Sequence, residues 1–154
     1  MISIANTLHL LSAIIWVGGM FFAYVVLRPV SARQLEPPQR LSLWSHVFSA
    51  FFPWVWAAII LLTGTGLWLI FNQFGGMKNV GVQVHIMLTL SLLMSIIFAH
   101  LFFAPHRQLK KFVAEKSWPE AAKALSKIRT LMAINLSLGL AVTVIASAGH
   151  LLFS

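Results

Sequence analysis

Four apolar stretches dominate this sequence, and each is long enough to cross the hydrocarbon core of a bilayer. They occupy residues 4–28, 42–71, 82–104 and 130–152. A spanning helix needs about 20 apolar residues, because an α-helix rises about 1.5 Å per residue across a core about 30 Å thick. Of the 154 residues, 59% are hydrophobic and 9% are charged. We therefore expect a single all-α transmembrane domain, residues 1–154, with four helices in an up-and-down bundle.

The positive charges are concentrated in two of the three connections. The net charge is +8; residues 105–129 carry most of it, residues 28–46 carry the next share, and residues 72–81 contain only Lys78. By the positive-inside rule, the first and third connections face the cytoplasm and both termini face outside. We therefore predict a multi-pass protein of the bacterial inner (plasma) membrane with periplasmic termini. Its basic residues are expected to contact the lipid bilayer, not nucleic acid.

The first connection carries signals that end a helix. Arg28-Pro29 places a helix breaker after the first stretch, and Pro37-Pro38 predicts an irregular connection up to about Leu41. The first stretch lacks a basic N-terminal region and a small-residue cleavage site. We therefore expect a retained helix and not a signal peptide.

The third connection carries signals that continue and restart helices. The residues after Pro105 keep a helical, amphipathic pattern, and Ser117 with Glu120 has the spacing of a capping box. We expect helices three and four to extend into a cytoplasmic helical hairpin over residues 105–129.

Histidine is the strongest metal-binding residue type in the four apolar stretches, because they contain no Cys, Asp or Glu. The sequence has no cysteine, which excludes disulfides, iron–sulfur clusters, thiolate copper sites and covalently attached haem. No Asp, Glu or Lys lies inside the four stretches, which argues against a carboxylate-based proton pump. The histidines form an outer level with His9, His85 and His150, and an inner level with His46, His100 and His106.

Paired imidazoles at one depth predict b-type haem. Helices one and three are diagonal in such a bundle, and the diagonal leaves room for a flat macrocycle. His9 and His85 are the predicted axial ligands of an outer haem iron. His46 and His100 are the predicted ligands of a second, inner haem iron.

Three further residues complete the predicted outer site. His150 would line it as a ligand, hydrogen-bond partner or proton donor. Trp16 shares the helical face of His9, and Gly19 thins the helix so that a flat ligand or another backbone can approach.

Two other interpretations fit the same sequence. The first is a copper transport or resistance protein that uses His9, His85, His150 and nearby methionines. The second is a cofactor-free structural or assembly subunit, in which the histidines are interfacial polar residues. His106 is assigned that interfacial role. The four methionines of the spans are interpreted as packing residues: Met20, Met87, Met94 and Met132. Asn135 and Ser137 are predicted to hydrogen-bond between helices.

The chain resembles a known family. His9, Trp16 and Gly19 have a spacing similar to that in the first helix of the CopD copper-resistance family and of HemJ-type protoporphyrinogen oxidases. The resemblance extends to Pro53 with Gly64, to His100, and to Arg129 with Asn135. It implies a small b-type haem membrane protein with His9 as the ligand from helix one. HemJ-type enzymes carry a Lys early in helix three, where this sequence has His85, which favours a second imidazole ligand over protoporphyrinogen oxidation.

Taken together, the sequence predicts a bis-histidine b-haem membrane protein, with one or two haems, that transfers electrons as a cytochrome or haem-dependent oxidoreductase. A quinone or an outer-face redox protein is the expected partner, and assembly into a homo-oligomer is left open. Copper handling is the alternative.

Overall fold

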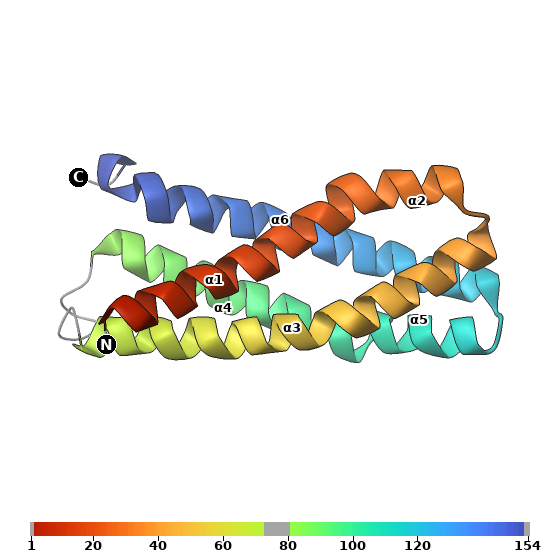
Figure 1. The fold of residues 1–154 in the computed structure, drawn as a ribbon, viewed down its shortest axis with the longest axis horizontal. Coiled ribbons are helices and arrows are strands. Elements are labelled where there is room, and N and C mark those ends of the chain that lie inside the picture. The colour runs from red at the N-terminus through yellow and green to blue at the C-terminus, as the bar shows by residue number, and fades with distance from the viewer. Residues whose placement is uncertain (1, 73–80, 153–154) are drawn as a thin grey trace.

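The computed structural model describes residues 2–72 and 81–152, with side chains over residues 4–72 and 81–148. All regular structure in these residues is helical (Figure 1), which confirms the predicted all-α bundle. The elements are α1 (Ile2–Phe21), the π-helical turn η1 (Phe22–Leu27), α2 (Arg28–Gln34), α3 (Pro37–Asn72), α4 (Val82–Phe103), α5 (Pro105–Ala114) and α6 (Trp118–Leu152).

Four of the described helical segments are long and apolar enough to cross a membrane. They are Ile4–Gln34, Pro37–Asn72, Val82–Ala114 and Trp118–Ala148. Large apolar side chains such as Trp54, Ile60 and Ile96 lie exposed on their surface. Lipid tails are as apolar as these side chains and can cover them. The backbone groups of the helices are already hydrogen-bonded within each helix, so the lipid leaves none of them unpaired. The chain is a multi-pass membrane protein.

The first helical segment continues past Pro29, so the prediction that it ends there is wrong. Proline has no N–H to donate, and its ring crowds the carbonyl four residues earlier. The π-helical turn η1 lies directly before Arg28 and widens the backbone there, so the segment continues as α2 to Gln34. α3 begins at Pro37, earlier than the predicted residue 42, because proline is tolerated in the first turn of a helix.

The helices associate in pairs. α1 packs along α3, and α4 packs along α6, while α5 packs against α6 and α3 (Figure 1). We call the end with the connections at residues 35–36 and 115–117 the hairpin end. We call the opposite end, where α1 and α4 begin and α3 ends, the termini end. Between α5 and α6, Lys116 adopts a left-handed conformation (φ 57°) that reverses the chain, and α6 begins at Trp118 as the Ser117–Glu120 spacing predicts.

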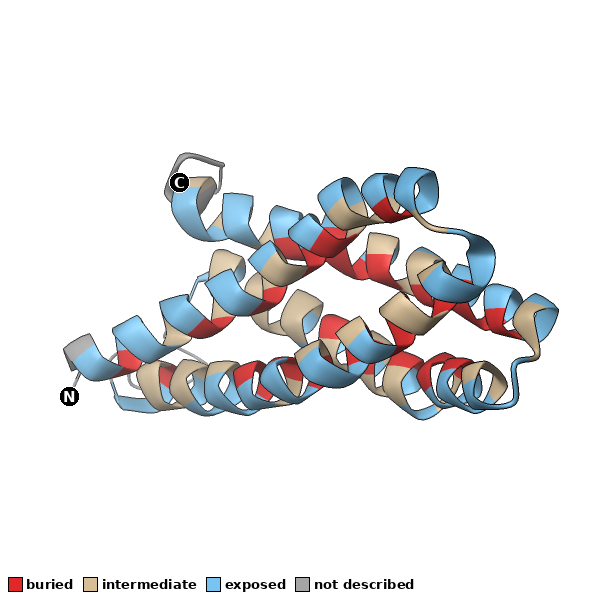
Figure 2. Cartoon of the chain, turned by 45° about the vertical axis from the view of Figure 1, so that its right-hand side comes forward, coloured by how far each residue is buried: buried red, intermediate tan, exposed pale blue. Residues whose placement is uncertain are grey.

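The buried core lies in the middle of the bundle and at the hairpin end (Figure 2). A row of aromatic rings on α3 runs through this core. The ring centroid of Phe48 lies 5.1 Å from that of Trp44 and 5.0 Å from that of Phe52. Phe52 meets Phe98 of α4 edge-on at 5.1 Å. Such offset and edge-to-face pairs add stability beyond the area that they bury. This core fixes α3 against α4 and α5.

One buried polar contact joins α6 to α4. Asn135 Nδ2 donates a hydrogen bond to the backbone oxygen of Met94 at 3.1 Å, which confirms the interhelical bond predicted for Asn135. The same prediction is wrong for Ser137, which is exposed and donates to Ala133 O in its own helix. Two positions along a helix turn the side chain by about 200°, so only one of the two residues can face α4.

Candidate metal sites

His9 lies at the termini end of α1 with its ring against α3. Its Nδ1 is 2.9 Å from Thr65 Oγ1, and Thr65 Oγ1 donates its single hydrogen to Leu61 O at 2.5 Å. The threonine oxygen must therefore accept from His9, which places the imidazole proton on Nδ1 and the lone pair on Nε2. The ring also lies beside Gly66, where a Cβ would be in ordinary van der Waals contact with His9 Cε1 at 3.4 Å. This is the orientation that a histidine ligand needs, with one nitrogen anchored and the other able to bind a metal.

The other histidines of the predicted outer site lie in different surroundings. His85 is exposed near the start of α4. α1 packs on α3 and α6, and the His9 ring is held by α3, so the described contacts do not join His9 to His85. The side chain of His150 lies outside the described residues. The axial pair remains a prediction.

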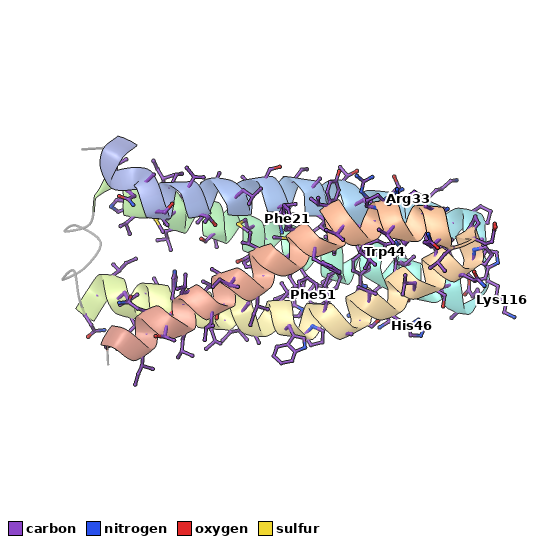
Figure 3. All side chains as sticks on the ribbon, turned by 45° about the horizontal axis from the view of Figure 1, so that its top comes forward. Phe21, Arg33, Trp44, His46, Phe51 and Lys116 are labelled. Carbon is purple, nitrogen blue, oxygen red and sulfur yellow. The ribbon has the colours of Figure 1, made fainter. Side chains whose placement is uncertain are left out.

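The predicted inner pair is also not joined by a described contact. His46 is exposed, and its Nδ1 donates to Ser42 O, 2.8 Å away in the same helix. Figure 3 shows His46 on the outer side of α3. His100 is exposed too, and it lines a surface groove between α4, α5 and α6. Among the described residues, no group of three or more His, Asp or Glu side chains comes together.

His106 is buried, so its assignment as an interfacial residue is wrong. It is 3% exposed and sits among the rings of Phe52 (4.8 Å), Phe102 (5.5 Å) and Phe48 (6.4 Å). Its Nδ1 is buried with no hydrogen-bond partner among the described residues. The sequence did hold a signal for this burial, because residue 106 shares a helical face with Phe102 and Leu109.

Trp16 and Gly19 lie against phenylalanine rings at the centre of the bundle. Trp16 is 2% exposed and meets Phe98 edge-on at 6.4 Å. A Cβ on Gly19 would overlap the ring of Phe51, which Figure 3 shows where α1 crosses α3. The close approach expected at Gly19 is therefore made by a phenylalanine side chain.

A small cavity of about 10 Å³ lies beside Trp16. Its volume is about that needed for one water molecule or one ion. Two thioethers line it, Met20 from α1 and Met132 from α6, together with Asn135. Trp16 Nε1 and Asn135 Oδ1 are both buried without a hydrogen-bond partner among the described residues. The residues that line the cavity thus include two methionines, and Trp16 and Asn135, each of which carries an unpaired buried polar atom.

Sequence reasoning missed this cavity. The signal available was the spacing of Trp16 with Met20 and of Met132 with Asn135, each pair one turn apart on one helical face. Nothing in the sequence shows that the two faces meet, because they belong to the first and last helices.

Comparison with known proteins identifies a family. The family model described as copper resistance protein D matches residues 45–148. The match covers α4 and α5 and most of α3 and α6, including Met132 and Asn135. His9, Trp16 and Gly19 precede it. No curated protein and no solved structure matches the chain.

Proposed function

The chain belongs to the copper resistance protein D family, and on that premise we propose that it carries copper(I) through the membrane. The observation that supports this function is the methionine-lined cavity at the centre of the bundle. Seven of its nine lining residues fall within the matched segment: Phe51, Phe52, Val55, Phe98, Leu101, Met132 and Asn135.

The chemistry of the cavity suits a soft monovalent ion. Thioether sulfur prefers copper(I) over harder cations such as Mg²⁺ or Ca²⁺. The sequence has no cysteine, so methionine and histidine are the ligands available to copper(I). Asn135 Oδ1 would add an oxygen ligand, and the face of the Trp16 indole would favour a nearby cation. A neutral ligand set also lets the ion leave again, as transport requires.

His9 is the proposed point of entry at the termini end. Thr65 fixes its ring and leaves the Nε2 lone pair for the ion. In this proposal His85 and His150 assist His9 at the same end of the bundle, and Met20 and Met132 take over at the centre.

Copper(I) competition with a chromogenic chelator tests the central site. We expect the double variant Met20→Leu/Met132→Leu to bind copper(I) at least about tenfold more weakly than the unaltered protein, equivalent to about 1.4 kcal/mol. Met94→Leu is the matched control, since Met94 is buried to the same degree but does not line the cavity. Equal affinities for all three proteins would mean that the cavity holds only water.

Haem b is the second candidate, and the orientation of His9 is the observation that favours it. An imidazole with Nδ1 anchored and Nε2 unprotonated suits haem iron as well as copper. Optical spectra of the purified protein, oxidised and then reduced, decide between them. A low-spin b-type spectrum that His9→Ala abolishes would establish haem ligation. A colourless protein from haem-replete cells would exclude it.

We propose that the hairpin end faces the cytoplasm, because the described positive charges all lie there. The absence of native cysteine makes this testable with single-cysteine variants. In intact cells, a membrane-impermeant maleimide should label Asn72→Cys at the termini end and leave Lys116→Cys at the hairpin end unlabelled. Both positions are exposed, so access across the membrane is what differs. The reverse labelling would invert the topology.

A further inference from the structure

A cavity of about 400 Å³ opens at the hairpin end, away from the methionine cavity. It lies where α2, the first turns of α3 and the start of α6 come together. It is lined by Arg28, Ala32, Pro37, Arg40, Leu41, Trp44, Trp118, Pro119, Ala122, Leu125 and Arg129. Its volume falls in the usual range for small-molecule sites. The chain therefore has room here for a ligand much larger than an ion.

Three guanidinium groups face this one cavity, and no acidic side chain lines it. Arg28, Arg40 and Arg129 come from three different helices, and each is only partly exposed. Within the described part of the chain, no carboxylate forms an ion pair with any of them. Three like charges around one cavity repel one another, so an anion bound between them would stabilise this end of the bundle.

Two of the three guanidinium groups are held in place by neighbouring groups. Arg28 Nε donates to Tyr24 O at 3.2 Å, and its guanidinium lies 4.5 Å from the centre of the Tyr24 ring. Arg40 donates to Ala32 O at 3.3 Å. These bonds use one donor of each guanidinium and leave the others for a ligand. A planar guanidinium with several N–H donors is suited to bidentate hydrogen bonding to two phosphate oxygens.

The remaining wall of the cavity is aromatic and apolar. Trp44 is fixed by a hydrogen bond from its Nε1 to Ser31 Oγ at 3.2 Å, and Figure 3 shows Trp44 within the bundle at this end. Trp118 also lines the cavity, from the first turn of α6. Tryptophan is enriched where membrane helices reach the headgroup region. An apolar wall beside three cations fits an anion that carries an apolar part.

We propose that this cavity binds one phosphate group, carried on an anionic phospholipid or present as free phosphate, between Arg28, Arg40 and Arg129. Basic pockets between membrane helices are a recurring way to hold anionic headgroups. The volume exceeds that of phosphate and leaves space for the glycerol portion of a lipid. The site joins α2 and α3 to α6, so its ligand stabilises the contact between the first and last helices. This inference does not depend on copper transport.

The test is a titration of protein purified in a neutral, phosphate-free detergent. The probes are short-chain phosphatidylglycerol, short-chain phosphatidylcholine and inorganic phosphate. Binding is followed by thermal unfolding and counted by native mass spectrometry. We expect one phosphatidylglycerol per chain and a raised melting temperature, with little effect of phosphatidylcholine. If inorganic phosphate alone produces the full rise in melting temperature and displaces the lipid, free phosphate is the ligand. If inorganic phosphate neither raises the melting temperature nor displaces the lipid, the ligand is the lipid headgroup.

The control variants distinguish specific binding in this cavity from nonspecific attraction of an anion to the positively charged surface. Arg40→Gln/Arg129→Gln should bind the successful probe at least about tenfold more weakly for each arginine removed. Arg33→Gln/Arg107→Gln removes the same charge from two exposed residues outside the cavity and should bind normally. Arg129→Lys keeps the charge but loses the bidentate geometry, so the affinity of this variant for the probe should lie between the affinities of the two double variants. Equal weakening of both double variants, or equal binding of phosphatidylcholine, would overturn the proposal.

Discussion

The two ends of this bundle are joined by the same four membrane-crossing segments but differ in how they are held together. At the hairpin end, aromatic rings of α3, α4 and α5 are buried against one another, and all the described charged side chains lie around them. At the termini end, few side chains are buried, and the contact between α1 and α3 includes the hydrogen bond of His9 with Thr65. The comparison indicates that the hairpin end supplies most of the buried packing of the fold, while the termini end carries the proposed ligand His9 without a tightly packed surrounding.

The largest effect is expected from the centre of the aromatic core. Phe52→Ala removes a side chain that is 2% exposed and contacts Phe48, Phe98 and His106. Loss of these contacts should lower the free energy of unfolding by about 3–5 kcal/mol. Unfolding in mixed micelles measures this. Trp54→Ala, nearby on α3 but 63% exposed, should change stability little. Equal losses would mean that burial does not distinguish the two faces of α3.

The next effect tests how closely α1 and α3 approach. Gly19→Ala places a methyl group in the Phe51 ring, so the free energy of unfolding should fall by about 1–3 kcal/mol. Gly18→Ala is the matched control, because nothing beyond its chain neighbours and the adjacent backbone of its own helix lies within 4 Å of its Cβ position. Alanine also favours the helix over glycine, so that variant should be neutral or slightly more stable. If Gly19→Ala behaves like Gly18→Ala, the ring of Phe51 can move aside without loss.

A smaller effect is expected from the buried hydrogen bond between α6 and α4. Asn135→Leu removes the bond to Met94 O and should cost about 0.6 kcal/mol, the average for hydrogen bonds between membrane helices, and at most about 1.7 kcal/mol. Ser137→Ala removes a bond within one helix on the exposed side of α6 and should have no measurable effect. Thermal unfolding of both variants provides the measurement. A stabilising Asn135→Leu would show that the unpaired Asn135 Oδ1 costs more than the bond contributes.

The smallest effect on stability, and the clearest on function, belongs to the termini end. Thr65→Val removes the acceptor that orients His9, so the free energy of unfolding should fall by no more than about 0.6 kcal/mol. Metal affinity should fall about tenfold, as for other residues that orient a ligand. Thr63→Val, an exposed threonine on the same helix, is the control. Retained metal affinity in Thr65→Val would remove His9 from the proposed path.

Periodicity and charge predicted the helical class, because four long apolar runs allow few other structures. They failed at Pro29, since a proline ends a helix only where the backbone cannot adjust, and the turn η1 adjusts it. They also failed at His106. This residue was assigned to the membrane interface because histidine is polar, although its position on an apolar helical face indicates burial. The copper-resistance family was recognised mainly from His9, Trp16 and Gly19, which precede the matching segment, whereas the weaker similarities at Pro53, Gly64, His100, Arg129 and Asn135 lie within it.

The two cavities were beyond sequence reasoning for a different reason. Met20 and Met132 lie in the first and last helices, and so do Arg28 and Arg129. Which residues meet across such distances is decided by how whole helices pack, and no local pattern encodes that. The predicted haem pairs required the same knowledge, and they remain predictions.

The aromatic core at the hairpin end also sets an order of assembly. A ribosome releases α3 before α4, α5 and α6 exist, so the face of α3 that bears Phe48 and Phe52 emerges without its later neighbours. Until those helices are inserted, lipid or the insertion machinery must cover that face. α1, by contrast, can pair with α3 at once, because Gly19 and Phe51 need nothing from the second half of the chain. We therefore expect α1 and α3 to pair first, and α1 to meet α6 only after α6 has been synthesised.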